Sequence, residues 1–269
     1  MKLAECQRKL FEKFSQIIRE NRLSHAYLFS GDFGSLDMAI WLAQSRFCLT
    51  PEDGLPCSHC RPCRLIAQGD FSDVKLVEPQ GQIIKTDIIR QLTREFSQSS
   101  FEGHAQVFII RDADKMHVNA ANSLLKFIEE PQSQIYIFLL TADDSRILPT
   151  IKSRAQLFYF PKNKAYLEDL LQREGLLLTQ AKVLADFAKD ETQALSLSKD
   201  KKVLDVIDIV ERFEQSLLAN HDLLYLDVAK LAVQCSEKSE QEMVWGFFNL
   251  SIGKGDTKST STTMVRFSF

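Results

Sequence analysis

HAYLFSGDFGSLDM, residues 25–38, is the stretch that indicates the fold of this 269-residue chain. A short apolar run leads into Gly31, and residues 36–47 carry apolar side chains at helical spacing. A buried strand that runs into a glycine-bearing turn and then into a helix is a repeating unit of parallel sheets. These residues therefore predict an α/β fold.

The alternation of strand and helix continues as far as residue 160. Further apolar runs of strand length occupy residues 74–77, 107–110, 135–140 and 157–160, and helical spacing recurs over 86–96 and 119–130. Because these runs are continuously apolar, helices must cover both faces of the sheet. We therefore expect a domain with a parallel sheet, of the kind that carries P-loops, over residues 1–161.

The pattern changes after Pro161, where no further strand-like run follows. Helical spacing occurs near residues 164–174, 180–189 and 192–197, then near 206–217, 222–235 and 240–250. These stretches predict two all-helical units, one over 162–200 and one over 201–269. Residues 251–269 are rich in Ser, Thr and Lys, so we expect a frayed tail.

Charge and hydropathy exclude two classes of protein. The chain has 33 basic and 36 acidic residues, a net charge of −3, whereas stand-alone binders of bare nucleic acid carry a basic excess. The longest uninterrupted apolar run, residues 135–140, is too short to cross a bilayer, so no membrane partner is expected. We expect a cytoplasmic protein whose six cysteines form no disulfides.

Four of the six cysteines form a pattern typical of a metal site. Cys57, Cys60 and Cys63 are each separated by two residues, and Cys48 stands at the end of the preceding predicted helix. This spacing lets four thiolates converge on one ion in a tetrahedral shell, which leaves no coordination position for water. The pattern predicts a structural zinc site in a module over residues 48–66.

Two other interpretations of the cysteines are weaker. An iron–sulfur run of the bacterial ferredoxin type needs a cysteine where this chain has Ala67. His59 could replace one thiolate, but with four cysteines available we expect it to be a bystander. Cys6 and Cys235 stand alone in the sequence and are expected to be packing thiols.

The glycine turn after the first strand lies where a phosphate-binding loop would be, but lacks its ligands. That motif reads Gly-x4-Gly-Lys-Ser/Thr. When the first glycine of the motif is placed on Gly31, the segment runs on through Gly34 and has Leu36 where the motif has its second glycine. Asp37 replaces the phosphate-binding lysine, and Met38 replaces the magnesium-binding hydroxyl. Because Asp37 would place negative charge beside a triphosphate, we expect a degenerate loop that binds no ATP.

Two later segments indicate that this loop derives from a working one. A working ATPase presents an acidic pair for magnesium and water after the strand at 107–110, where this chain has Arg111, Asp112 and Asp114. The strand that includes residues 138–140 ends in polar residues, where a phosphate sensor would lie. Asp112 and Asp114 have neither a partner base nor an intact phosphate loop, which argues against a two-carboxylate active site.

The segments 25–29, 81–85, 122–131 and 151–154, with the four-cysteine module after the first helix, resemble the delta-prime family of subunits of the bacterial DNA polymerase III clamp loader. The resemblance extends from residue 1 to about residue 200. It implies an AAA+ α/β domain with an inserted zinc module, a helical lid, and a helical collar that joins a pentamer. By this resemblance the lid is expected over 162–200 and the collar over 201–269. The segment from Lys201 onward holds fewer helices than a full collar, so we expect a collar that is shortened or altered at its C-terminus.

The resemblance also implies a function in DNA replication. Members of the family act as a non-hydrolysing stator beside the ATP-binding gamma/tau subunits and the delta subunit. The assembly opens a sliding clamp and places it on primed DNA. By this resemblance the chain has no enzymatic activity of its own, although it is a subunit of a nucleotidyltransferase, the DNA-directed DNA polymerase holoenzyme.

One residue is implied to act chemically, in a neighbouring subunit. Ser153 and Arg154 correspond to the family's Ser-Arg-Cys signature, whose arginine is an arginine finger that reaches the neighbour's ATP site. A guanidinium offers fixed donors and a permanent charge to the γ-phosphate in the transition state. Ala155 departs from the usual cysteine, at a position that we interpret as packing.

Two functions from other classes stay open. One is an active ATPase motor of the gamma/tau type. Nucleotide binding by the isolated chain would favour this function, whereas the presence of Asp37 argues against it. The other is a zinc-knuckle nucleic-acid-binding module attached to an unrelated α/β domain. Salt-dependent DNA binding that is lost on mutation of Arg61 and Arg64 would favour that second function.

Overall fold

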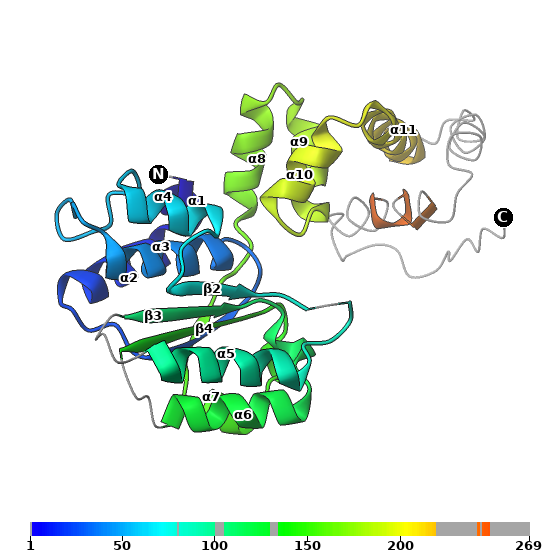
Figure 1. Ribbon diagram of the computed structural model, residues 1–269. Coiled ribbons are helices and arrows are strands. Elements are labelled where there is room, and N and C mark those ends of the chain that lie inside the picture. Colours follow the sequence, from blue (N-terminus) through cyan, green and yellow to red (C-terminus); the bar gives the residue numbers. More distant parts are fainter. Residues whose placement is uncertain are drawn as a thin grey trace. The chain divides into compact units, whose positions relative to one another are not determined.

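The computed structural model describes residues 2–79, 81–99, 105–129, 134–218, 241–242 and 244–247. The chain divides into two compact units, residues 1–163 and 164–269, and Figure 1 shows their elements. Three sequence predictions fall wholly or mainly outside the described residues: a helix near 222–235, most of a helix near 240–250, and the tail 251–269. The same holds for Cys235.

The first unit is built on a five-stranded sheet in which every strand pair is parallel. The strands are β1 (Ala26–Ser30), β2 (Val74–Val77), β3 (Gln106–Ile110), β4 (Ile135–Thr141) and β5 (Gln156–Tyr159). Their order across the sheet is β2-β3-β4-β1-β5. The parallel α/β sheet predicted from the apolar runs is confirmed.

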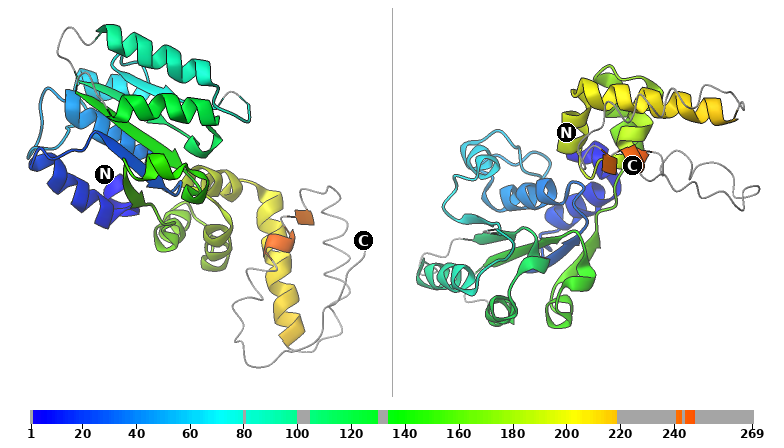
Figure 2. Two further views of the ribbon diagram at one scale, coloured as in Figure 1. Left: turned by 90° about the horizontal axis from the view of Figure 1, so that it is seen from below. Right: turned by 90° about the vertical axis from the view of Figure 1, so that its right-hand side faces the viewer.

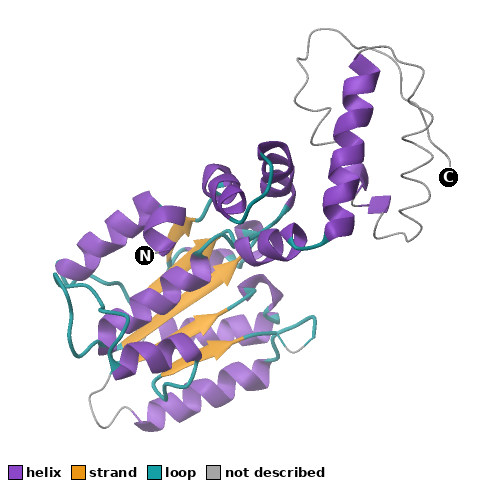
Figure 3. Cartoon of the chain, turned by 90° about the horizontal axis from the view of Figure 1, so that it is seen from above, coloured by secondary structure: helices purple, strands orange, loops and turns teal. Residues whose placement is uncertain are grey.

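Helices cover both faces of this sheet, as the continuous apolar runs required. Figure 1 shows α2, α3 and α4 on one face and α5 and α6 on the other. Figures 2 and 3 show helices on both sides of the sheet from further directions. The helices of this unit are α1 (Lys2–Cys6), α2 (Arg8–Arg19), α3 (Ser35–Phe47), α4 (Arg61–Gln68), α5 (Thr86–Ser99), α6 (Val118–Glu129) and α7 (Pro149–Lys152). Short 3-10 turns occupy Ala113–Lys115 and Asp144–Arg146.

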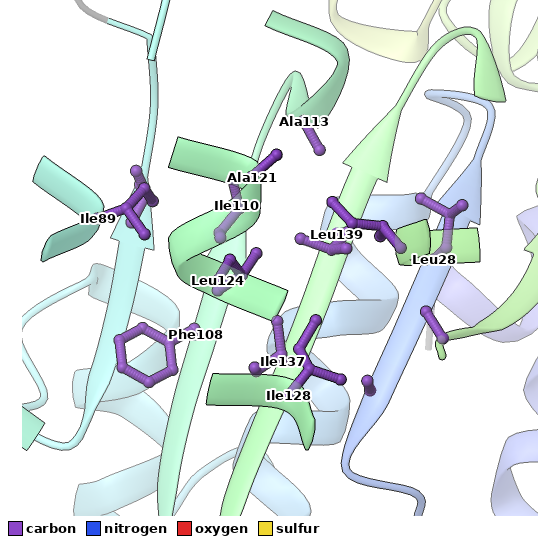
Figure 4. Close-up of a cluster of buried hydrophobic side chains, with 14 of the residues drawn as sticks. Leu28, Ile89, Phe108, Ile110, Ala113, Ala121, Leu124, Ile128, Ile137 and Leu139 are labelled. Atoms are coloured by element: carbon purple, nitrogen blue, oxygen red, sulfur yellow. The ribbon is translucent and has the colours of Figure 1, made fainter. Parts of the chain in front are cut away.

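The first strand divides its side chains between two cores. Tyr27 and Phe29 pack against Phe14 of α2, with ring centroids 5.6 Å apart in each pair. Leu28 points to the opposite face, where it joins a cluster that includes Leu124 of α6 (Figure 4). Side chains alternate along a strand, so an apolar run buried on both faces holds the two helical layers to one sheet.

The second unit contains only helices among its described residues. They are α8 (Lys164–Arg173), α9 (Leu178–Phe187), α10 (Glu191–Ser198) and α11 (Lys201–Leu218), with further helical residues at 241–242 and 244–247. The Gln180 amide of α9 donates to the Asp208 carboxylate of α11 over 2.8 Å. The boundary predicted at residue 200 between a lid and a collar stays a prediction. No helix in the described part of the chain combines the length and the apolar character needed to span a bilayer.

Candidate metal centre and degenerate phosphate loop

The four predicted metal ligands come together at the junction of two helices. Cys48 follows the last residue of α3, Cys57 lies in the loop, and Cys60 and Cys63 belong to the start of α4. Their four Sγ atoms all lie within 4.8 Å of one another. The four sulfurs thus lie close together, although the residues come from the end of α3, the loop after it and the start of α4.

One pair of sulfurs in the cluster has the spacing expected around a zinc ion. Four sulfurs around an ion at about 2.3 Å would stand about 3.8 Å apart, and Cys48 Sγ and Cys57 Sγ are 3.6 Å apart. The backbone N–H of Cys57 donates to Cys48 Sγ, and that of Cys60 donates to Cys57 Sγ, each over 3.3 Å. N–H donors aimed at sulfur stabilise thiolates, the form that a metal requires. The residues present fit a metal ion bound by four thiolates.

The protein environment shifts the acidity of these thiols in different directions. The Thr50 hydroxyl donates to Cys57 Sγ over 3.3 Å and lowers the pKa of Cys57 to about 6. Burial raises the pKa of Cys63 and that of Cys48. A divalent cation among the sulfurs would favour the thiolate at all four positions and offset this burial.

The loop that carries the cluster has little apolar core of its own. Residues 49–55 are half-exposed or exposed, and Leu49 is 72% exposed. The Gln44 amide of α3 donates to the Cys63 carbonyl over 2.8 Å, which joins the two helices directly. His59 is exposed and lies apart from the four sulfurs, with its Nδ1 2.9 Å from the Cys57 carbonyl oxygen. A metal would supply the ordering that burial does not.

The segment predicted to be a degenerate phosphate loop turns from β1 into α3 at the carboxyl edge of the sheet. Gly31 and Gly34 have φ values of +107° and +78°, in the range that favours glycine. Gly34 is the N-cap residue of α3. The turn therefore needs glycine at both positions for its backbone conformation.

The N-terminal helix α1 fills the space around this loop. A Cβ at Gly34 would lie 3.1 Å from Cys6 Sγ and 3.7 Å from Leu3 Cδ1. The Gln7 side chain, itself buried, donates to the carbonyl oxygens of Phe33 over 2.8 Å and Pro161 over 2.7 Å. Sequence reasoning missed Gln7, because nothing along the chain relates it to residues more than 25 positions away.

The residues that replace the nucleotide ligands lie in contrasting places. Asp37 is half-exposed, and its carboxylate lies 4.0 Å from the Lys2 ammonium group. Met38 is completely buried in the face of α3 that packs on the sheet. A hydroxyl at position 38 would therefore stand inside an apolar core, whereas a lysine at position 37 would extend toward solvent.

The carboxyl ends of β3 and β4 are joined by polar side chains of the chain itself. The Thr141 hydroxyl donates to the Asp114 carboxylate over 2.8 Å, and the Arg146 guanidinium lies 3.3 Å from the same carboxylate. Arg111, at the predicted metal-binding position, pairs instead with Glu78 at 2.7 Å. The polar residues expected to face a nucleotide are therefore engaged with protein groups.

A second polar cluster ends strand β1, and sequence reasoning did not find it. The Ser30 hydroxyl donates to the Asp144 carboxylate over 3.0 Å, and the Lys152 ammonium group donates to the same carboxylate over 2.8 Å. The Lys152 hydrogen bond lowers the pKa of Asp144. The sequence carries little signal for this cluster, because its three polar residues lie in separate segments and follow no regular spacing along the chain.

Ser153 and Arg154 follow helix α7 directly. Arg154 Nη1 donates to the Thr150 carbonyl over 3.0 Å and to Ser153 Oγ over 3.1 Å. Arg154 Nε forms an ion pair with the carboxylate of Glu129, the last residue of α6. The arginine side chain is 39% exposed, so the structure holds it at the surface of the first unit.

Comparison with known proteins identifies close sequence relatives. A family model described as "DNA polymerase III, delta subunit" matches residues 6–164. The DNA polymerase III subunit delta' of Bacillus subtilis is 41% identical over 200 residues, which cover 73% of this chain and 60% of that protein. The subunit delta' of Escherichia coli is 33% identical over 180 residues, covering 65% and 54%. The chain thus matches only a little over half the length of these relatives.

A second group of relatives has a different name. The DNA polymerase III subunit tau/gamma of Haemophilus influenzae is 31% identical over 144 residues, which cover 53% of this chain and 21% of that protein. This match is shorter and weaker than those to the delta' subunits.

Proposed function

Because this chain belongs to the DNA polymerase III delta' family, we propose that it acts as a non-hydrolysing stator subunit of the bacterial clamp loader. Its partners in this role are the gamma/tau and delta subunits, and through them the sliding clamp and primed DNA. The resemblance of residues 1–200 to AAA+ clamp-loader subunits supports this role.

The observation that carries the stator proposal is the packing of α1 against the phosphate loop. Cys6 of α1 and Gln7, which follows it, lie close to Gly34, and we infer that they occupy space that a bound phosphate would need. Asp37 adds a negative charge where a P-loop has its lysine. Steric filling and charge both oppose nucleotide binding, so we expect this subunit to bind no ATP.

The four cysteines fit a structural role within this proposal. Cys48, Cys57, Cys60 and Cys63 would hold one zinc ion through four sulfurs, and such an ion supplies folding energy rather than catalysis. Apparent binding at such sites is about 10–16 kcal/mol at neutral pH. That is enough to order a loop that buries few apolar side chains.

Arg154 is the residue through which the stator would contribute to ATP hydrolysis. We assign it the role of an arginine finger, acting with Ser153 on the ATP site of a neighbouring subunit. Its partial exposure and its position after α7 support that role, because a buried guanidinium could not reach another chain. In GTPases an arginine supplied in trans accelerates hydrolysis by about 10³–10⁵-fold.

Reconstitution with purified gamma/tau and delta subunits tests the proposal. The chain should co-elute with both partners on gel filtration. A complex that contains Arg154→Ala should assemble equally well and lose most of the ATPase stimulation that clamp and primed DNA produce. Unchanged ATPase would refute the arginine-finger assignment, and failure to co-elute would refute the stator role itself.

Binding assays on the isolated chain separate the two other candidate functions. Titration with a fluorescent ATP analogue should show no binding, whereas saturable binding would favour an ATPase motor. Titration with single-stranded and duplex DNA should show none at physiological salt. Salt-dependent DNA binding that disappears in an Arg61→Ala, Arg64→Ala double variant would favour a zinc-knuckle module.

A further inference from the structure

We propose that Glu129 is a positioning residue for Arg154: its carboxylate orients the guanidinium for the phosphate of a neighbouring subunit's ATP. This inference rests on the arginine-finger role proposed above. Glu129 ends α6 and Arg154 follows α7, so the pair joins two elements at the surface of the first unit.

The guanidinium is anchored along two of its three nitrogens. Arg154 Nε pairs with Glu129, and Nη1 donates to the Thr150 carbonyl and to Ser153 Oγ. None of the residues that the structure describes accepts a hydrogen bond from Nη2. The side chain is 39% exposed, so we expect the donors that these contacts leave over to serve a phosphate oxygen.

Of these contacts, only the one to Glu129 adds an opposite charge. Thr150 contributes a backbone carbonyl and Ser153 a hydroxyl, and both lie within four residues of Arg154. Glu129 comes from another helix, so it also sets the direction of the side chain relative to the fold. Holding an arginine side chain in one rotamer before the partner arrives removes part of the entropy cost of ordering it later.

The geometry also defines the alternative. If Glu129 simply competed with the nucleotide for the guanidinium, its removal would release Arg154 and raise the ATPase rate. If it positions Arg154, its removal leaves the charge in place and disorders the side chain, so the rate falls. The two mechanisms therefore predict opposite signs for the same substitution.

A first experiment measures the anchoring in the isolated full-length chain, without any ATPase. The Arg154 Nε–H signal, assigned by its loss in Arg154→Lys, should be resolved in a nitrogen-15 spectrum because its pairing with Glu129 slows exchange with water. Glu129→Ala should abolish that signal. Glu78→Ala is the matched control, since Glu78 forms a similarly exposed ion pair with Arg111 in the same unit. An Arg154 signal that survives in Glu129→Ala overturns the proposal.

A second experiment measures function in the reconstituted complex. The Arg154-dependent rate is the difference in kcat between complexes with the wild-type chain and with Arg154→Ala. Glu129→Ala should reduce this difference by about threefold or more, with KM for ATP little changed, since supporting residues of a site often contribute about 10-fold. Glu129→Gln, which keeps an acceptor for Nε, should restore part of the rate, and Glu78→Ala should have no effect.

The outcomes separate this inference from the proposed function. An Arg154→Ala complex with the wild-type rate refutes the arginine finger and the Glu129 role with it. A slowed Arg154→Ala complex beside an unchanged or faster Glu129→Ala complex refutes only the Glu129 role. In the double variant, Glu129→Ala should add nothing to Arg154→Ala, because a residue that acts through the arginine has no effect without it.

Discussion

Gly31 lies against the backbone of Phe160: a Cβ at Gly31 would stand 2.2 Å from the Phe160 carbonyl oxygen. The contact fixes the turn after β1 against the chain that leaves β5, and the Phe160 N–H donates to the Ser30 carbonyl over 2.7 Å beside it. Gly31, the first glycine of the predicted phosphate loop, is therefore needed for packing in this chain, whether or not a nucleotide binds.

Replacement of this glycine should destabilise the protein strongly. Gly31→Ala combines a φ of +107° with a backbone clash, and we expect a loss of about 2–6 kcal/mol in the free energy of unfolding. Gly69→Ala is the control, because Gly69 has a φ of +81° and nothing within 4 Å of its Cβ position. It should cost only about 1–2 kcal/mol. Equal losses in urea denaturation would contradict the packing role of Gly31.

The hydrogen bond at the end of β4 should also contribute to stability. Thr141→Val keeps the shape of the side chain but leaves the buried Asp114 carboxylate without its 2.8 Å donor. We expect the free energy of unfolding to fall by about 1–3 kcal/mol. The same change at the exposed Thr192 should stay within about 0.5 kcal/mol. A loss at Thr141 no larger than that at Thr192 would show that the bond contributes nothing.

The Asp144–Lys152 pair predicts a pH dependence. The Lys152 ammonium group, together with the Ser30 hydroxyl, lowers the pKa of Asp144 below its ordinary value of 3.8. A lowered folded-state pKa means that the contribution to stability is present above the ordinary value and is lost as pH falls through the folded one. The gap in unfolding free energy between wild type and Asp144→Asn should therefore be largest near neutral pH and shrink below about pH 3.8. A gap that stays constant from pH 7 to pH 3 would be evidence against this linkage.

The metal centre predicts one zinc ion per chain. Elemental analysis of native protein should find about one equivalent, and Cys60→Ser should lose it because one of four sulfurs is removed. Protease cleavage within residues 49–60 should accelerate in the same variant. Cys6→Ser, at a buried thiol outside the cluster, should keep the full zinc content. Native protein with well under one equivalent would contradict the site.

Restoring the phosphate-binding lysine should not restore nucleotide binding. Asp37→Lys reverses the local charge, but Cys6 of α1 and Gln7, the N-cap residue of α2, still pack around Gly34. We expect no binding of a fluorescent ATP analogue at millimolar concentration. Saturable binding by the Asp37→Lys chain would mean that charge alone, and not the packing of α1, excludes the nucleotide.

The strands and a helix of the first unit could be predicted from local patterns, whereas the metal-ligand role of the four cysteines stays a prediction. The apolar run that includes Leu28 is buried on both faces, and the run at 74–77 forms β2 with the predicted bounds. The helix expected over 119–130 is α6, Val118–Glu129, within one residue at each end. These elements follow from hydrophobic periodicity, which depends only on neighbours along the chain.

The partners of the polar residues could not be predicted in the same way. Sequence reasoning identified Asp114 but not its hydrogen-bond donor Thr141. It identified Arg154 but not its counter-ion Glu129. Each of these pairs joins residues from separate elements, and their proximity depends on the order of strands in the sheet. Polar contacts carry no periodicity that a single sequence reveals.

The sequence by itself determined the parallel α/β sheet, the spacing of four cysteines suited to one ion, and the presence of Asp37 at the position where a phosphate loop needs lysine. Those features reside in short stretches, where spacing along the chain already sets spacing in space. Only the tertiary structure decided that α1 fills the loop around Gly34, that Gly31 meets Phe160, and that Glu129 anchors Arg154. These contacts join residues far apart in the chain, and packing of the elements is what brings them together.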